Sequence, residues 1–306
     1  MEQATAIAPP RQVLSRRQRA WRTFIRNRTA VAGLVMVIFI LLVAIFADSS
    51  VVPWIQDRNP QPLLAPYNPI KQDSRSRLTP PNAEHPMGLD TYGRDNLSRI
   101  IYGTRVSLLV GVASVALGGA IGTLLGLIAG YTGGKVETFI MRSVDVVMAF
   151  PSLIMGLMVL AVLGAGLTKM VIAIGIMLSP GFVRVVHSAA ISIKENDYIL
   201  SARAIGVKHT RILLVHVLPN LLGEVVVLGS IWTASAIRIE ASLSFIGLGV
   251  SPPTPAWGTM IREGTQYLTT APYLSIFPGL AILFTVLAFN LLGDGLRDVL
   301  DPKLYD

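Results

Sequence analysis

The sequence predicts an all-α protein that crosses a membrane several times, and three observations lead to this fold class. Of its 306 residues, 52% are hydrophobic and only 14% are charged, and the mean hydropathy is +0.58. A soluble domain of this size could not cover so much apolar surface with so few charges. Several apolar windows exceed the roughly 18 residues that mark a spanning helix. These windows are continuous, whereas the strands of a membrane β-barrel would be about 10 residues long with alternating hydrophobicity.

Six apolar segments are long enough to act as membrane spans. They cover residues 31–47, 106–131, 138–163, 168–190, 217–240 and 272–293. An even number of spans places both termini on one side, and a dense group of arginines before the first span predicts that this side is the cytoplasm. These arginines are Arg11, Arg16, Arg17, Arg19, Arg22, Arg26 and Arg28.

The predicted topology divides the chain into four parts. Residues 1–30 form a basic cytoplasmic segment, in which Leu14, Trp21, Phe24 and Ile25 have the spacing of an amphipathic interfacial helix. Both its basic region and the following apolar run are too long for a cleaved signal peptide, so we expect an uncleaved anchor. The remaining parts are the first span with a long Pro-rich external loop (31–104), a core of five spans (105–294) and a cytoplasmic tail (295–306).

Composition and motifs argue against several other classes of protein. The net charge of +8 is concentrated before the first span, which favours membrane orientation over nucleic-acid binding. The chain has no Cys, and its four His residues lack metal-ligand spacing, so we expect no metal site. The run Gly133-Gly134-Lys135 is followed by Val136 instead of the Ser or Thr of a phosphate-binding loop. No ATPase site is therefore expected on this chain, and no cofactor.

The second span carries a glycine at every fourth position. A repeat of small residues at this spacing lets another helix approach to backbone contact. Two interpretations remain open from the sequence: tight packing inside this subunit, or a helix that lines an interface or a pore. The glycines are Gly118, Gly122, Gly126 and Gly130.

Ionisable residues and prolines inside the spans are the candidates for a pore or gate. A charge near mid-bilayer costs about 2.5–3.5 kcal/mol on insertion scales, so such residues face a cavity, a partner or the interface. Asp145 and Arg184 are pore-lining candidates, whereas most of the other ionisable residues in the spans, among them Glu240, are expected to snorkel to the interface. Pro151 and Pro278 break helical hydrogen bonds and predict kinks that could act as hinges.

A short polar insert, residues 191–214, lies between the fourth and fifth spans on the predicted cytoplasmic side. Asn196 or Asp197 can cap a helix start, residues 198–205 can form two turns, and Gly206 suits the left-handed position after a helix. The insert therefore predicts a short helix that a partner could hold, although an ordinary surface connector fits the same residues.

Residues 197–220 resemble the cytoplasmic coupling-loop motif of ABC importer permeases, which reads roughly E-A-A, three residues, G, then I-x-L-P. Ala202, Gly206, Leu218 and Pro219 match the motif in spacing, whereas its leading Glu and first Ala fall at Leu200 and Ser201. The resemblance implies that the insert contacts an ATPase. The residues it assigns to ATPase coupling are Tyr198, Ser201, Ala202, Arg203, Gly206 and Pro219.

Three further stretches resemble the second, C-type permease subunit of the dipeptide, oligopeptide and nickel branch of that family. They run from Gly88 to Leu108, from Ala241 to Gly258 and from Phe277 to Pro302. The resemblance covers the chain from about residue 20 onward. It implies a type I importer permease fold with six spans in a bacterial cytoplasmic (inner) membrane.

The same resemblance implies a set of partners and a mechanism. The partners are a homologous second permease, two cytoplasmic ATPase subunits that bind ATP and Mg, and an external substrate-binding protein. Transport would proceed by alternating access, with di- or oligopeptides as cargo. Glutathione and nickel remain alternative cargoes, and a self-sufficient channel or secondary carrier, or a membrane scaffold, remain alternative classes.

Overall fold

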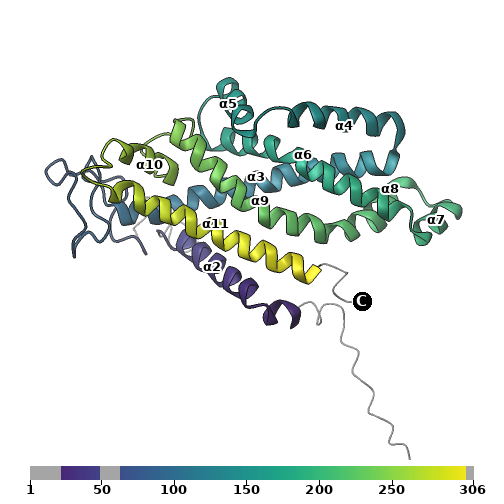
Figure 1. Ribbon diagram of the computed structural model, residues 1–306, viewed down its shortest axis with the longest axis horizontal. Coiled ribbons are helices and arrows are strands. Elements are labelled where there is room, and N and C mark those ends of the chain that lie inside the picture. Colours follow the sequence, from purple (N-terminus) through teal and green to yellow (C-terminus); the bar gives the residue numbers. More distant parts are fainter. Residues whose placement is uncertain (1–21, 49–62, 301–306) are drawn as a thin grey trace, which may run out of the picture.

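The computed structural model describes residues 22–48 and 63–300, and within them the chain forms a bundle of long helices without a β-strand (Figure 1). The elements are α2 (Arg28–Ile45), α3 (Asn96–Thr132), α4 (Gly134–Met148), α5 (Ser152–Leu163), α6 (Leu167–Lys194), α7 (Asp197–Ala204), α8 (His209–Arg211), the π-helix η2 (Ile212–Val217), α9 (Leu218–Ile246), α10 (Trp257–Thr265) and α11 (Tyr273–Leu300). The all-α fold class is confirmed.

Five helical segments in the described part of the chain are long and apolar enough to cross a membrane. They are α2, α3, α6, the continuous stretch His209–Ile246 and α11. The third expected span is present as two helices, α4 and α5, which meet at an angle of 94° (Figure 1). The sequence predicted one span over residues 138–163 with a kink at Pro151, and the structure shows that bend as a break between two helices.

Pro151 explains why the third span is divided. It has no amide hydrogen, and its ring disfavours helical geometry at the preceding residue, so α4 ends at Met148, three residues before it. Pro151 has an extended ψ of 131° and stands directly before the first residue of α5. The expected kink is thus a complete break.

Several spans are longer than hydropathy predicts, and capping residues explain two of the extensions. The helix α3 begins ten residues before the expected span, because Asp95 caps it: its carboxylate accepts a hydrogen bond from the Ser98 amide at 2.8 Å. The fifth span extends to Ile246, where Gly247 ends α9 in the left-handed conformation with φ of 100°.

A proline that the sequence analysis overlooked, Pro180, lies inside α6. Its missing amide hydrogen would leave the carbonyl of Ile176 without a partner, and the Ser179 hydroxyl donates to that carbonyl at 2.9 Å. The helix therefore continues through Pro180. Pro278 likewise lies inside α11, which continues past it as one helix.

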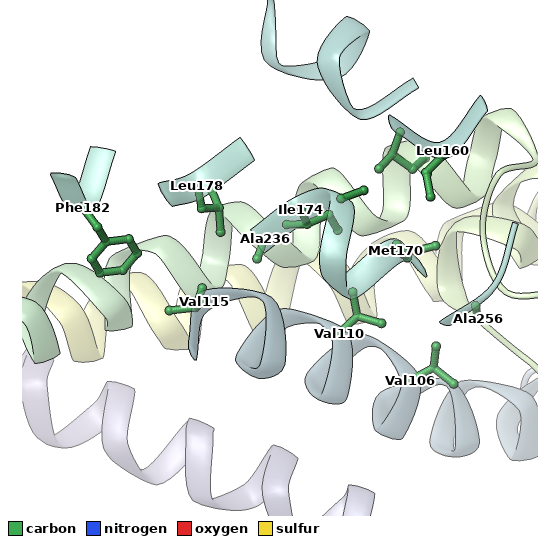
Figure 2. Packing of buried hydrophobic residues seen from close by; sticks show 12 residues of the cluster. Val106, Val110, Val115, Leu160, Met170, Ile174, Leu178, Phe182, Ala236 and Ala256 are labelled. Atoms are coloured by element: carbon green, nitrogen blue, oxygen red, sulfur yellow. The ribbon is translucent and has the colours of Figure 1, made fainter. Parts of the chain in front are cut away.

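The core lies where α3, α5, α6 and α9 meet (Figure 2). The most extensive contact in the bundle joins α3 to α6. Figure 2 shows Val110 of α3, Ile174 of α6 and Ala236 of α9 within this cluster. A second cluster joins α2, α10 and α11 to the other side of α3 and α9.

The two ends of the bundle differ in character. One end carries α7 and α8, and the opposite end carries α10 and the irregular segment 63–95 (Figure 1). The start of α2 and the end of α11 are joined by a hydrogen bond of 3.0 Å from Asn27 Nδ2 to Asp298 Oδ2. Most of the expected amphipathic helix at 11–29 lies outside the described residues.

Candidate coupling helix and helix-packing sites

The short helix expected in the polar insert is present as α7. Asn196 occupies the N-cap position in extended conformation. At the other end, the amides of Gly206 and Val207 donate to the carbonyls of Arg203 (2.9 Å) and Ala202 (3.0 Å). These two bonds form a Schellman motif, which requires the left-handed residue that Gly206 supplies with φ of 78°.

The helix α7 is anchored to two spans. Ile199 is fully buried in a cluster that contains Leu127 of α3 and Val186 of α6. The guanidinium of Arg203 lies 4.8 Å from the ring centroid of Tyr131 in α3, within the range of a cation–π interaction. The Tyr131 hydroxyl is in turn 2.7 Å from Nδ1 of His209. These contacts connect α7 to the adjoining ends of α3 and α6.

The sides of α7 that face away from the bundle carry exposed apolar side chains. Tyr198, Leu200 and Ile205 are 46%, 49% and 81% exposed, respectively. Three large apolar side chains on an eight-residue helix and its cap form a surface that suits a protein groove. Sequence reasoning named Tyr198 but missed Leu200 and Ile205, although large apolar residues within a polar insert were a visible signal.

The structure separates the residues assigned to coupling. Ser201 and Gly206 are exposed with Tyr198, whereas Ala202 and Arg203 are half-buried on the side of α7 that faces the bundle. Pro219 is exposed, but it lies beyond the π-helix at the start of α9. Ile199 and Tyr131, which connect α7 to the spans, were not identified from the sequence.

The glycine repeat of α3 faces α6 of the same chain. A Cβ at Gly118 would lie 2.6 Å from the carbonyl oxygen of Gly175, and one at Gly126 would lie 2.7 Å from that of Val183. Gly122 and Gly130 have equally close backbone neighbours in α6. Lipid removes the hydrophobic drive for helix association, so this close backbone packing is what holds the two spans together.

The structure brings together two of the pore candidates. Arg184 Nη2 of α6 donates to Asp145 Oδ1 of α4 at 2.8 Å, and both side chains are about half exposed. Pro151 lies at the break after α4. Pro278 is buried in α11, and α9 lies between α11 and α4 (Figure 1). The four candidates therefore do not form one cluster.

Glu240 corrects the expectation that most ionisable residues in the spans reach the interface. It is fully buried in α9, and its carboxyl group accepts hydrogen bonds from Ser107 of α3 at 3.0 Å and from Ser244 at 2.8 Å. No Arg, Lys or His within residues 22–48 and 63–300 forms an ion pair with it. The carboxyl group thus ties α9 to α3 inside the bundle.

A buried ion network closes the end of the bundle opposite α7. Asp90 pairs with Arg94 (2.6 Å) and with Arg99, and both arginines also reach Glu263 of α10, at 2.9 and 3.0 Å. Asp95 binds His85 at 2.9 Å in addition to capping α3. Asp90, Arg94 and Asp95 therefore fix this segment to α3 and α10. No cluster of three or more His, Cys, Asp or Glu side chains suited to a metal occurs in the described part of the chain.

Two protein families match parts of this chain. Residues 122–305 match the family described as "Binding-protein-dependent transport system inner membrane component", and residues 15–81 match the N-terminal transmembrane domain of oligopeptide transport permease C. Among solved structures, the fold is similar to that of the MetNI methionine ABC transporter in inward-facing form, with a TM-score of 0.55 and 19% identity over 66% of this chain and 97% of that chain. That likeness concerns the fold.

Several curated relatives cover nearly the whole chain. The dipeptide transport system permease protein DppC of Alkalihalophilus pseudofirmus is 39% identical over 99% of this chain and 93% of its own length. The di/tripeptide permease DppC of Pseudomonas aeruginosa is 40% identical over 99% and 98%. The glutathione transport system permease protein GsiD of Pectobacterium atrosepticum is 42% identical over 93% and 90%.

Fold and sites together define a multi-pass membrane permease, the membrane subunit of an ABC importer. The chain belongs to the family of binding-protein-dependent transport system inner membrane components, and its N-terminal part matches the oligopeptide permease C type within that family.

Proposed function

We propose that this permease imports short peptides across the bacterial cytoplasmic membrane by alternating access. Relatives named as dipeptide and di/tripeptide permeases, at 39% and 40% identity over nearly the whole chain, support this cargo class. The glutathione permeases are equally similar. Glutathione is itself a short peptide with free carboxylates, so it falls within the proposed class.

The proposed assembly contains this chain, a homologous second permease, two ATPase subunits that bind ATP and Mg, and an external binding protein. Both termini of this chain and α7 lie on the cytoplasmic side. The segment 63–95 and the region around α10 lie outside, where the binding protein docks. The glycine-rich contact between α3 and α6 makes these two spans move as one body, and Asp145 with Arg184 borders the pathway.

The observation that carries the proposal is the construction of α7. Its exposed face presents Tyr198, Leu200 and Ile205, and its buried face is fixed to α3 and α6 through Ile199 and Arg203. A small rigid projection with an apolar surface and a firm attachment is what a partner needs to move the spans. ATP-driven closure of the ATPase pair would displace α7, and a ligand drives such a change only if the two states bind it differently.

Reconstitution tests this function directly. The chain is placed in proteoliposomes with the second permease, alone or with the ATPases and the peptide-loaded binding protein, and uptake of radiolabelled trialanine is measured. We expect ATP-dependent uptake only with all components. Uptake by the permease pair alone would identify a channel or secondary carrier, and failure of the complete complex to import any peptide would exclude peptide cargo.

A further inference from the structure

A polar pocket of about 490 Å³ opens at the end of the bundle that is opposite α7. Its walls come from the irregular segment 63–95, the turn between α5 and α6, the segment after α9, and α10. Pockets for small ligands typically have about 300–1,000 Å³, so this one has the size of a small-molecule site. The lining residues used below are Arg77, Tyr92, Gly247, Arg262, Glu263 and Tyr267.

The pocket carries uncompensated positive charge. Glu263, 25% exposed at its side chain, is balanced by Arg94 and Arg99, and these in turn bind Asp90, so that network is neutral. Arg77 and Arg262 have no carboxylate within 4.0 Å among residues 22–48 and 63–300. Two guanidinium groups on one pocket, without acidic partners of their own, attract an anion.

One arginine is fixed by a backbone hydrogen bond, and the other lies against a glycine. Arg77 Nε donates to the carbonyl of Thr91 at 3.1 Å, which leaves its two terminal nitrogens for a ligand. The guanidinium of Arg262 fills the space beside Gly247, where a Cβ would collide with it. This position is at the carbonyl end of α9, where the helix dipole favours a cation.

We propose that this pocket receives the C-terminal carboxylate of the peptide as it leaves the external binding protein, an inference that rests on the proposed peptide import. A guanidinium binds a carboxylate through two parallel hydrogen bonds, which makes arginine the most suitable residue for this group. Tyr92 and Tyr267 supply aromatic surface for peptide side chains, and the Glu263 oxygen that Arg94 and Arg99 do not use is available to an ammonium group. If the pocket instead received one acidic side chain of a docked protein, most of its volume of about 490 Å³ would stay unfilled.

The test compares trialanine as the free acid with trialanine amide, which lacks the C-terminal negative charge. Uptake is measured in the complete reconstituted complex with the wild-type chain, R77Q and R262Q. The same binding protein serves every arm, so its own preference cancels when acid-to-amide ratios are compared between variants. The matched control is R75Q, an exposed arginine in the same segment that does not line the pocket.

The expected result is a loss confined to the free acid. Since one charge-assisted hydrogen bond is worth about a factor of ten, R262Q and R77Q should each lower kcat/KM for the acid about tenfold and leave the amide unchanged. R75Q should behave as wild type.

Two results would overturn the inference while leaving peptide import intact. One is an unchanged acid-to-amide ratio in both variants. The other is a reduced stimulation of the ATPase by peptide-free binding protein in R262Q, because the arginine would then bind a carboxylate of that protein. If the wild-type complex imports neither peptide, the proposed function itself fails, and this inference fails with it.

Discussion

Replacing Gly206 by valine is expected to abolish peptide uptake while the complex still assembles and hydrolyses ATP. Gly206 has φ of 78°, and a Cβ there would meet nothing within 4 Å, so the substitution causes no collision. The cost is in the backbone, because the left-handed conformation disfavours a β-branched residue by about 1–2 kcal/mol. The chain would leave that conformation, and the bonds that end α7 at Arg203 and Ala202 would be lost.

Uptake and ATPase activity measured together in proteoliposomes check this prediction. We expect uptake at least about tenfold below wild type at near-normal basal ATPase activity, the signature of a lost coupling contact. G206N is the control, because asparagine tolerates the left-handed region, and it should keep most of the uptake. Normal uptake in G206V with normal ATPase stimulation would show that the shape of α7 does not matter for coupling.

Replacing Gly122 by leucine is expected to have the largest effect on assembly. A Cβ at this position would lie 2.6 Å from the carbonyl oxygen of Ser179 and 3.1 Å from the amide nitrogen of Val183, both in the α6 backbone. Rigid backbone cannot yield as a side chain can, so α3 and α6 must separate. Overpacking of a core costs about 1–3 kcal/mol for ordinary insertions, and this case adds three further carbon atoms.

The amount of intact complex recovered after detergent extraction and size-exclusion chromatography measures this effect, with a large loss expected for G122L. The control is G229A in α9, where the new Cβ would have an ordinary contact of 3.5 Å with Val115. A complex of normal yield and stability with G122L would mean that the glycine contact between α3 and α6 does not hold the subunit together.

Local signals predicted much of this structure. Long apolar windows located the five spans that form continuous helices, because the number of residues needed to cross a bilayer is fixed by its thickness. The helix in the polar insert was also predictable, since Gly206 ends it through bonds to its own chain neighbours; the expected side-chain cap by Asn196 is not formed. The glycine spacing indicated close packing but did not identify the partner helix, which proved to be α6.

Contacts between residues far apart in the chain could not be predicted from the sequence. Ser107, which binds Glu240, is 133 residues away in the chain, so an apparently exposed charge was in fact buried. Hydropathy gives the length of an apolar segment but not the orientation of its helices, so it could not show that α4 and α5 meet at 94°. The anchoring of α7 depends on Ile199 meeting α3 and α6, a contact made only after the bundle has formed.

An ATPase can move the spans through α7 only if α7 lies on the cytoplasmic side of the membrane. The chain contains no Cys, so a single cysteine at Ile205, the most exposed large apolar side chain of α7 and its cap, can be labelled without background. In membranes that hold the whole transporter, a thiol-to-amine cross-linker should join I205C to an ATPase subunit, and a membrane-impermeant thiol reagent should reach it in inside-out vesicles but not in intact cells. Labelling of I205C from outside intact cells, with no adduct to the ATPase, would contradict the coupling role of α7.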